Sequence, residues 1–412
     1  GTNSAGDLGV ASNVTYEHRN FLRGGETFRV RLNAAYEFIR PTDSLDLLDN
    51  SYYEYGAEVF LSIPQLLLPW MLKRLQDQPS ASTEYAIGAN FQKRPEYFRQ
   101  FFNLSTRFQW SSMEWKLLHV LEPMGVTYVR MPWSSERFKE LYLSEEANPI
   151  LRYSYDEQLI VRTAYNLTYT NYNRIGRRAM PKIPFRIRSG VEVAGWLPRI
   201  VTGLGGGEQN SRGFYEFFKI PYAEYVKGDI DFAPTYRIDD QRTIAAHAAI
   251  GVAYPYGNST ILPFEKRYFG GGANSVRGWS TRTLGPGSYN NDSTLSDFGR
   301  RVGDVKLDFS VEYRRKLTKL IELAGFVDAG NIWTIREYSE QPGGLFEWSN
   351  FYKELAVAYG LGIRFDLNFL LIRVDGGMKA HNPALPVGSR WTIFKPNFGR
   401  DFAFHFAIGY PF

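Results

Sequence analysis

The feature that most constrains this chain is a two-residue alternation of apolar and polar side chains, which recurs along most of its 412 residues. In the closing stretch "DFAFHFAIGYPF" at 401–412, Phe404 and Phe406 fall on one face, and Ala403 and His405 fall on the other. A period of two is that of a β-strand, because successive side chains of a strand point to opposite faces. The sequence therefore predicts an all-β fold.

The same alternation predicts fifteen strands, several of which have the length of about nine to eleven residues that a tilted strand needs to cross a bilayer. The helical alternative is excluded because it requires runs of about 20 apolar residues, and the chain has none. The predicted strands are 7–18, 26–38, 52–62, 83–93, 96–110, 115–131, 157–170, 184–199, 221–238, 242–255, 304–316, 320–333, 354–367, 369–380 and 401–412.

Alternation alone does not say which face points outward, so a soluble β-sandwich or helix-covered sheet with a buried aromatic face remains an alternative. The polar faces carry charges of both signs mixed with Gly and Ala, which suits a crowded polar lumen. Aromatic side chains at strand ends favour the interfacial girdles of a transmembrane barrel. The residues concerned are Tyr52, Tyr53, Trp110, Trp196, Trp333 and Phe412.

The composition argues against several classes of function. A net charge of +5 is small for this length and does not indicate nucleic-acid binding. The absence of cysteine excludes disulfides and thiolate metal sites. No leader begins at Gly1, so a secretion signal is expected to have been removed or to lie outside the sequence.

The long non-strand region 256–303 contains the most unusual stretch, "PFEKRYFGGGANSVRGW" at 263–279. Loops of this length are commonly functional, and the mixture of aromatic residues with an isolated arginine predicts packing. Three consecutive glycines, Gly270, Gly271 and Gly272, allow positive φ angles and close backbone approach. A phosphate-binding loop is excluded because no Gly-Lys-Ser/Thr sequence follows.

Three motifs resemble outer-membrane assembly barrels of the BamA and TamA type. The sequence "FGGGANSVRGW" is similar to the sixth extracellular loop of that family, whose Val-Arg-Gly-aromatic motif is matched by Val276, Arg277, Gly278 and Trp279. The stretch "GFVDAGNIW" resembles the strand that places an acidic residue opposite the arginine, and "FHFAIGYPF" resembles the last strand.

The resemblance spans the whole chain and implies a transmembrane antiparallel β-barrel over residues 1–412. The family barrel has 16 strands, so the first strand would be missing or truncated here, as the likeness of 18–26 to the turn after the second strand also implies. Region 256–303 would be an extracellular loop folded into the lumen. The periplasmic POTRA modules of the family would be absent from this sequence.

The resemblance further implies an insertase in the bacterial outer membrane, with no catalytic residues, metal or other cofactor. Its partners would be nascent outer-membrane β-barrel proteins, outer-membrane lipids, and accessory lipoproteins or periplasmic assembly proteins. Nucleic acid is not expected.

Residue chemistry supports a buried pair between the loop and a strand. If the apolar face meets lipid, Asp328 projects into the lumen, where a loop entering from outside would bring Arg277 to it. Arginine can bind a carboxylate with two hydrogen bonds, which fixes its position. Glu312 and Asp308 are further acceptors on the same side. The simpler alternative is that Arg277 is an ordinary loop arginine and Asp328 a residue at a strand end.

The resemblance implies a weak seam between the first and last strands, where a substrate strand adds to the exposed edge. Gly409 and Pro411 would weaken the closing strand, because glycine packs no side chain and proline donates no ladder hydrogen bond. Pro411 can equally be the frayed end of that strand. The aromatic signal on this strand comprises Phe404, Phe406, Tyr410 and Phe412.

Three rival functions remain open. A two-partner secretion pore of the same superfamily shares the loop motif, whereas a passive porin would seldom need it. A barrel enzyme has little support, because the sequence contains no GxSxG or HExxH motif and its histidines are scattered. His405 is expected to form a hydrogen bond in the lumen and not to act as a base.

Overall fold

The structure is a computed structural model that describes residues 8–38, 51–67, 78, 80–94, 97–143, 152–153, 155–172, 181–204, 209–210, 213–290, 301–367 and 369–412. The chain divides into two compact units. The first consists of residues 1–167, 190–226 and 255–263, and the second of residues 168–189, 227–254 and 264–412.

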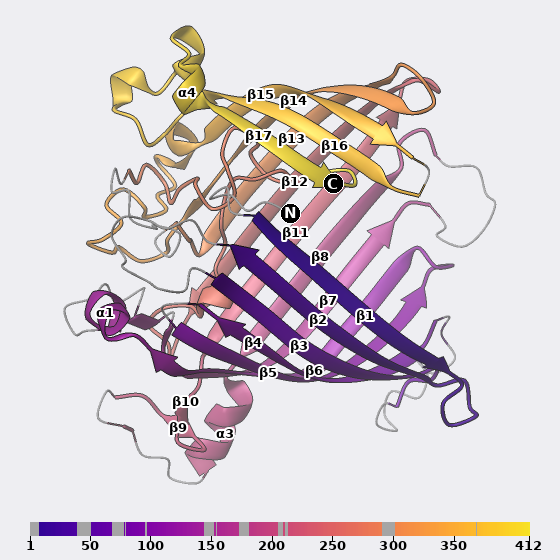
Figure 1. Ribbon diagram of the computed structural model, residues 1–412, viewed down its shortest axis with the longest axis vertical. Helices are drawn as coiled ribbons and strands as arrows, with labels where there is room; N and C mark the ends of the chain where they lie inside the picture. The colour runs from indigo at the N-terminus through magenta and orange to yellow at the C-terminus, as the bar shows by residue number, and fades with distance from the viewer. Residues whose placement is uncertain are drawn as a thin grey trace. The chain divides into compact units, whose positions relative to one another are not determined.

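Fifteen strands form one sheet in the order β1 to β8 followed by β11 to β17, so almost every strand neighbours the one that follows it in sequence (Figure 1). Consecutive strands pair antiparallel from β1 to β6 and from β12 to β17. The strands are β1 (Leu8–Arg19), β2 (Thr27–Phe38), β3 (Ser51–Ile63), β4 (Ser82–Lys93), β5 (Tyr97–Ser112), β6 (Leu117–Ser134), β7 (Gln158–Thr170), β8 (Phe185–Ala194), β11 (Tyr225–Arg237), β12 (Arg242–Pro255), β13 (Val305–Lys316), β14 (Ile321–Trp333), β15 (Ala356–Asp366), β16 (Leu371–His381) and β17 (Phe402–Ile408).

The remaining elements are short. Strands β9 (Glu216–Phe217) and β10 (Ile220–Pro221) pair with each other, and the α-helices are α1 (Glu136–Phe138), α3 (Trp196–Leu204) and α4 (Phe398–Asp401). A π-helical turn follows α1 (Lys139–Leu143), and 3-10 turns are Phe264–Lys266, Phe351–Glu354, Val387–Ser389 and Thr392–Phe394. None of the helices in the described ranges is both long and apolar enough to span a membrane.

The fifteen strands predicted from alternation are confirmed, with corrections at some ends. The run 184–199 was too long, because β8 ends at Ala194, Gly195 has a φ of 85°, and α3 begins directly afterwards. The run 221–238 began too early, since β11 starts at Tyr225. The additional first strand implied by the resemblance would precede Leu8, outside the described residues.

Exposure identifies the outward face of the strands. On β13 the apolar residues Phe309, Val311 and Tyr313 are exposed, whereas Asp308 and Glu312 on the opposite face are buried. On β15, Leu361 is 75% exposed and Arg364 is 0% exposed. A flank of exposed aliphatic and aromatic side chains over a buried charged flank is the arrangement of a barrel in lipid, because water would oppose it. The soluble alternative is therefore wrong.

Two of the aromatic residues expected at an interfacial girdle are instead buried. Trp333 is completely enclosed at the end of β14, where its Nε1 donates to Glu354 Oε2 at 2.7 Å. Trp110 packs with Leu66 and Phe108. The prediction used only the position of each tryptophan at a strand end. That position is the same for an indole that faces lipid and for one that neighbouring residues cover.

Candidate functional site: the Arg277 network

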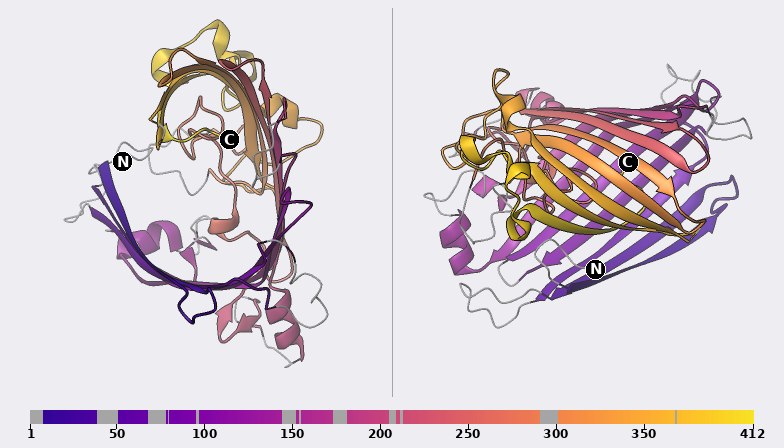
Figure 2. Two further views of the ribbon diagram at one scale, coloured as in Figure 1. Left: turned by 90° about the vertical axis from the view of Figure 1, so that its right-hand side faces the viewer. Right: turned by 90° about the horizontal axis from the view of Figure 1, so that it is seen from above.

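The segment 264–290 of the long loop lies against the polar face of the strands of the second unit (Figure 2). Val276, Trp279 and Leu284 of this segment form a buried apolar cluster with Ala356 and Ala358 of β15. The two alanines leave room for larger loop side chains on that face. This part of the loop is thus a packed component of the unit.

Arg277 forms a dense set of hydrogen bonds with two strands. Its Nε donates to Asp328 Oδ2 and its Nη2 to Asp328 Oδ1, both at 2.8 Å, and its backbone N–H also donates to Asp328 Oδ2 at 3.1 Å. Its Nη1 donates to Glu312 Oε2 at 2.6 Å. The Cζ atom lies 3.4 Å from the ring centroid of Phe326. The structure therefore brings the loop arginine to both predicted acidic residues, on β14 and β13.

The environment of Arg277 keeps its side chain charged. Burial opposes the charge, but the hydrogen bonds and negative charges of Asp328 and Glu312 outweigh burial and raise the pKa of the guanidinium. Removing one member of such a pair leaves a buried charge without its partner, which costs about 3–5 kcal/mol. The pair fixes the position of the loop for this reason.

The ion pairs continue beyond the predicted residues. Glu312 also accepts from Arg314 at 2.7 Å and from Arg364 at 2.8 Å. Arg364 donates in turn to Asp375 at 2.7 Å, and Arg373 lies 3.3 Å from Asp375. Alternating positive and negative groups allow several charges to be buried together, since each has an opposite partner within hydrogen-bonding reach.

Strands β16 and β17 also hold the loop. Arg373 on β16 donates from Nη1 to the carbonyl of Ala273 at 2.9 Å and from Nη2 to Asn274 Oδ1 at 2.6 Å. His405 on β17 has its Nε2 2.9 Å from the carbonyl oxygen of Arg277. Arg277 thereby contacts β13 and β14 through its side chain and β17 through its backbone.

Sequence reasoning missed Arg364, Arg373 and Asp375 as members of the site. Alternation does place Arg364 on the polar face of β15, so its presence on that face could be predicted. The polar residues that lie beside it on neighbouring strands depend on strand register, which alternation does not give. Asp308 was expected as a further acceptor for Arg277, and it accepts instead from Ser275 Oγ of the loop and lies 3.2 Å from Lys306 Nζ.

The glycines of the loop have different structural roles. Gly271 and Gly272 have φ angles of 84° and 103°, in the region that favours glycine. Gly270 forms a bridge with Leu284, which closes the segment on itself. Gly278 packs against β15, where an added Cβ would lie 2.8 Å from Ala358 Cβ.

The closing strand is shorter than the sequence predicted. Phe404 and Phe406 are each 63% exposed on β17, as outward residues should be. The strand ends at Ile408, because Gly409 has a φ of 83°, and the run predicted to continue to Phe412 was wrong there.

The last residues turn away from the strand direction toward the polar face. Arg314 Cζ lies 4.3 Å from the ring centroid of Tyr410 and 5.5 Å from that of Phe412. The ring of Phe412 also stacks on His247, with centroids 5.3 Å apart. Phe412 is thus not part of a lipid-facing girdle.

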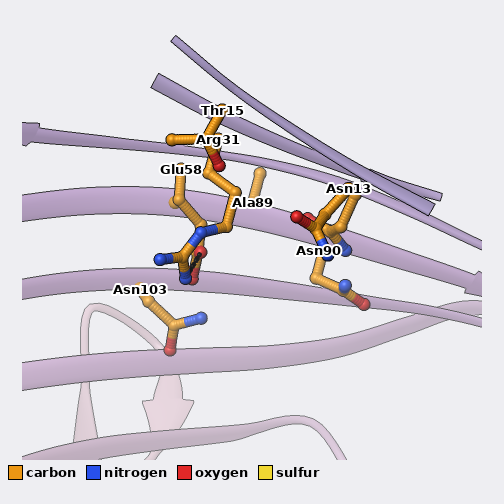
Figure 3. A pocket seen from close by; sticks show the side chains of 9 residues that line it. Asn13, Thr15, Arg31, Glu58, Ala89, Asn90 and Asn103 are labelled. Carbon is orange, nitrogen blue, oxygen red and sulfur yellow. Dashed lines mark hydrogen bonds and ion pairs between the residues drawn. The ribbon is translucent and has the colours of Figure 1, made fainter. Parts of the chain in front are cut away.

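The first unit has a different polar face. A cavity of about 480 Å³ opens between side chains of β1 to β5. Figure 3 shows Arg31 beside Glu58 in this cavity, where they form an ion pair at 3.3 Å with both side chains partly exposed. The remaining lining is mostly neutral and consists of Asn13, Thr15, Asn33, Gly88, Ala89, Asn90 and Asn103.

Comparison with known proteins agrees with the fold. A model of the Omp85 superfamily domain matches residues 4–412. The chain belongs to the Omp85 superfamily. Over 103 residues it is 31% identical to the outer membrane protein assembly factor BamA of Neisseria meningitidis serogroup B, a match that covers 24% of this chain and 12% of that protein.

Two solved structures share the Omp85 fold. BamA from Haemophilus ducreyi lacking POTRA domains 1–3 aligns with a TM-score of 0.57 at 15% identity, covering 97% of this chain and 68% of that chain. CdiB from Acinetobacter baumannii aligns with a TM-score of 0.50 at 10% identity, covering 97% and 56%. The protein is therefore a bacterial outer-membrane β-barrel of the Omp85 superfamily, a group of assembly and transport barrels.

Proposed function

We propose that the protein folds and inserts other β-barrel proteins into the outer membrane through an edge formed by its first and last strands. The observation that carries the proposal is that strand β17 is short and lies at the end of the sheet order. It has seven residues, fewer than any other of the fifteen strands in the described part of the chain, and it stands at one end of the strand order. The partial match to a BamA sequence supports the same function.

The proposed mechanism is strand addition. Strand β17 has seven paired positions with β16, whereas β1 and β2 have twelve. Backbone groups at an edge in lipid have no water to bind, so an incoming strand that pairs with them is stabilised. The Arg277 network would brace β13 and β14 while the terminal strand exchanges partners.

The substrates in this proposal are nascent outer-membrane β-barrel proteins, and the surrounding outer-membrane lipids take part by deforming locally. Accessory lipoproteins or periplasmic assembly proteins would deliver those substrates. Strand exchange forms and breaks only hydrogen bonds, so the proposal assigns no catalytic residue and no cofactor.

The test is reconstitution of the full-length protein in liposomes with a urea-unfolded outer-membrane barrel as substrate. Folding of the substrate is followed by its resistance to SDS at room temperature. We expect faster insertion than in empty liposomes, and a slower rate with Arg277→Ala. Arg31→Ala is the matched control, because it removes an arginine from the polar face of β2 that is paired with a partly exposed Glu58. An insertion rate equal to that of empty liposomes would rule out the proposed function.

The two-partner secretion pore remains the second candidate, because the CdiB fold is also similar. A secretion pore must open its interior to an unfolded chain, which requires displacement of the packed segment 264–290. Conductance in planar bilayers separates the functions. A large open current on addition of an unfolded polypeptide would favour secretion, whereas a barrel that stays mostly closed while substrates insert favours assembly.

A further inference from the structure

The backbone carbonyl of Arg277 is bound by the terminal strand. His405 on β17 is buried, and its Nε2 lies 2.9 Å from that carbonyl oxygen. A carbonyl oxygen can only accept, so the hydrogen bond requires the proton of the neutral imidazole to be on Nε2. The tautomer of His405 is thus a direct consequence of this contact.

The contact links two parts of the site directly. These parts are also connected through the sheet and through Arg314 on β13, whose Cζ lies 4.3 Å from the ring centroid of Tyr410 just after β17. The side chain of Arg277 is held by Asp328 on β14 and Glu312 on β13. Its carbonyl is held by β17, three strands further along the sheet order. One loop residue therefore spans the unit from β13 to its last strand.

The loop backbone reaches His405 because β16 has no side chain in the way. A Cβ on Gly377 would lie 2.1 Å from the carbonyl oxygen of Arg277. Gly377 pairs with Ala403 in the β16–β17 register. Ala403 is two residues before His405 and lies on the same face of β17. A small residue on each strand lets the loop carbonyl approach the histidine.

We propose that His405 is a positioning residue that couples the terminal strand to the loop, so that β17 is released only when the Arg277 carbonyl is released. The consequence for insertion rests on the proposed function, but the coupling itself does not. Loss of the Nε2 donor should loosen β17 and the loop together while the guanidinium remains bound to β13 and β14.

Hydrogen–deuterium exchange of the full chain in lipid nanodiscs measures this coupling, because exchange reports local opening. His405→Phe keeps an aromatic ring and removes the donor. We expect exchange to rise about tenfold in peptides covering 402–408 and 270–282, as for a buried carbonyl that loses its partner. His405→Gln retains a donor of similar reach and should restore exchange to within about twofold of the natural protein.

His381 provides the matched control. It is also buried, and its Nδ1 lies 2.7 Å from the carbonyl oxygen of Leu355, a contact that includes neither β17 nor Arg277. His381→Phe should raise exchange near Leu355 and leave the loop peptide unchanged. An equal rise in the loop for both variants, or no rise for His405→Phe, would overturn the coupling.

A second measurement needs no variant. Solid-state NMR of the ¹⁵N-labelled protein in lipid reads the tautomer of each buried histidine. A proton on Nε2 of His405 supports the proposal, and a neutral ring with the proton on Nδ1 overturns it even if the Phe variant fails to fold.

The liposome assay then separates the two proposals. Absence of insertion by the natural protein would reject the insertase function and leave the exchange result standing. Insertion unchanged in His405→Phe despite faster exchange would show that the coupling exists but does not limit the rate, which contradicts its assigned role in releasing β17.

Discussion

The polar faces of the two units have the same alternating pattern and different electrostatics. On β1 to β5 of the first unit, Arg31 and Glu58 are partly exposed beside a cavity lined mainly by neutral groups. At the polar face of β13 to β17 in the second unit, the strand residues Glu312 and Asp328 and the loop residue Arg277 are enclosed, with exposures of 1% or less. The difference arises from the segment 264–290, which covers one face and excludes water there. An ion pair is worth little where water screens it and is costly to break where it is enclosed.

The strongest test of this comparison is Arg277→Ala. It leaves Asp328 and Glu312 without the cation that contacts both, so we expect a loss of about 3–5 kcal/mol in the free energy of unfolding. Urea unfolding in lipid vesicles measures the loss, with tryptophan fluorescence as the signal. A loss no greater than that of Arg31→Ala would mean that coverage by the loop has no energetic importance.

Gly377→Ala tests the close approach of the loop without touching a charge. The new Cβ would lie 2.1 Å from the carbonyl oxygen of Arg277, so the loop or the strand must move. Forcing extra volume into a packed region costs about 1–3 kcal/mol. Gly325→Ala is the control, because its Cβ would meet only Leu361 at an ordinary 3.7 Å. Equal stability of the two variants would contradict close packing of the loop on β16.

Gly409→Ala tests how the terminal tail leaves β17. Alanine is disfavoured by about 1 kcal/mol or more at the positive φ of this position, although no atom lies within 4 Å of the new Cβ. We expect the tail to lose its contact with Arg314, and Tyr410 and Phe412 to become more accessible. Hydroxyl-radical labelling of Tyr410 and Phe412, read by mass spectrometry, checks this expectation, and unchanged labelling would argue that the turn at Gly409 does not hold the tail.

The smallest effect is expected on the open face. Arg31→Ala removes a 3.3 Å pair whose side chains are 41% and 43% exposed, so the change should be about 0–1 kcal/mol and should decrease further in high salt. The same urea unfolding experiment measures it at low and high ionic strength. A loss comparable with that of Arg277→Ala would remove the distinction between the two faces.

Much of the fold could be predicted because strand alternation is a local property. Alternation placed Phe404 and Phe406 together on the apolar face of the closing strand, and both are exposed. Predictions failed where a neighbouring segment decides the environment. Trp333 has the position of a girdle residue in sequence, but it is enclosed and its indole donates to Glu354.

The candidate site was partly predictable for the same reason. The loop motif singled out Arg277, and the polar faces of two strands offered Asp328 and Glu312 as partners. His405 was expected to form a hydrogen bond in the lumen, but its partner could not be read in this way, and neither could that of Arg373. Both residues bind a backbone carbonyl of the loop, and backbone atoms have no signature in the sequence.

The sequence by itself determined where the strands run and which flank of each is apolar, because those properties depend on neighbouring residues and their two-residue period. Only the tertiary structure decided which polar flank is covered and which charges meet. Arg277 and Glu312 are 35 residues apart, and Arg277 and His405 are 128 apart. Contacts over such separations depend on register and loop packing, and they decide whether a charge lies in water or among its partners.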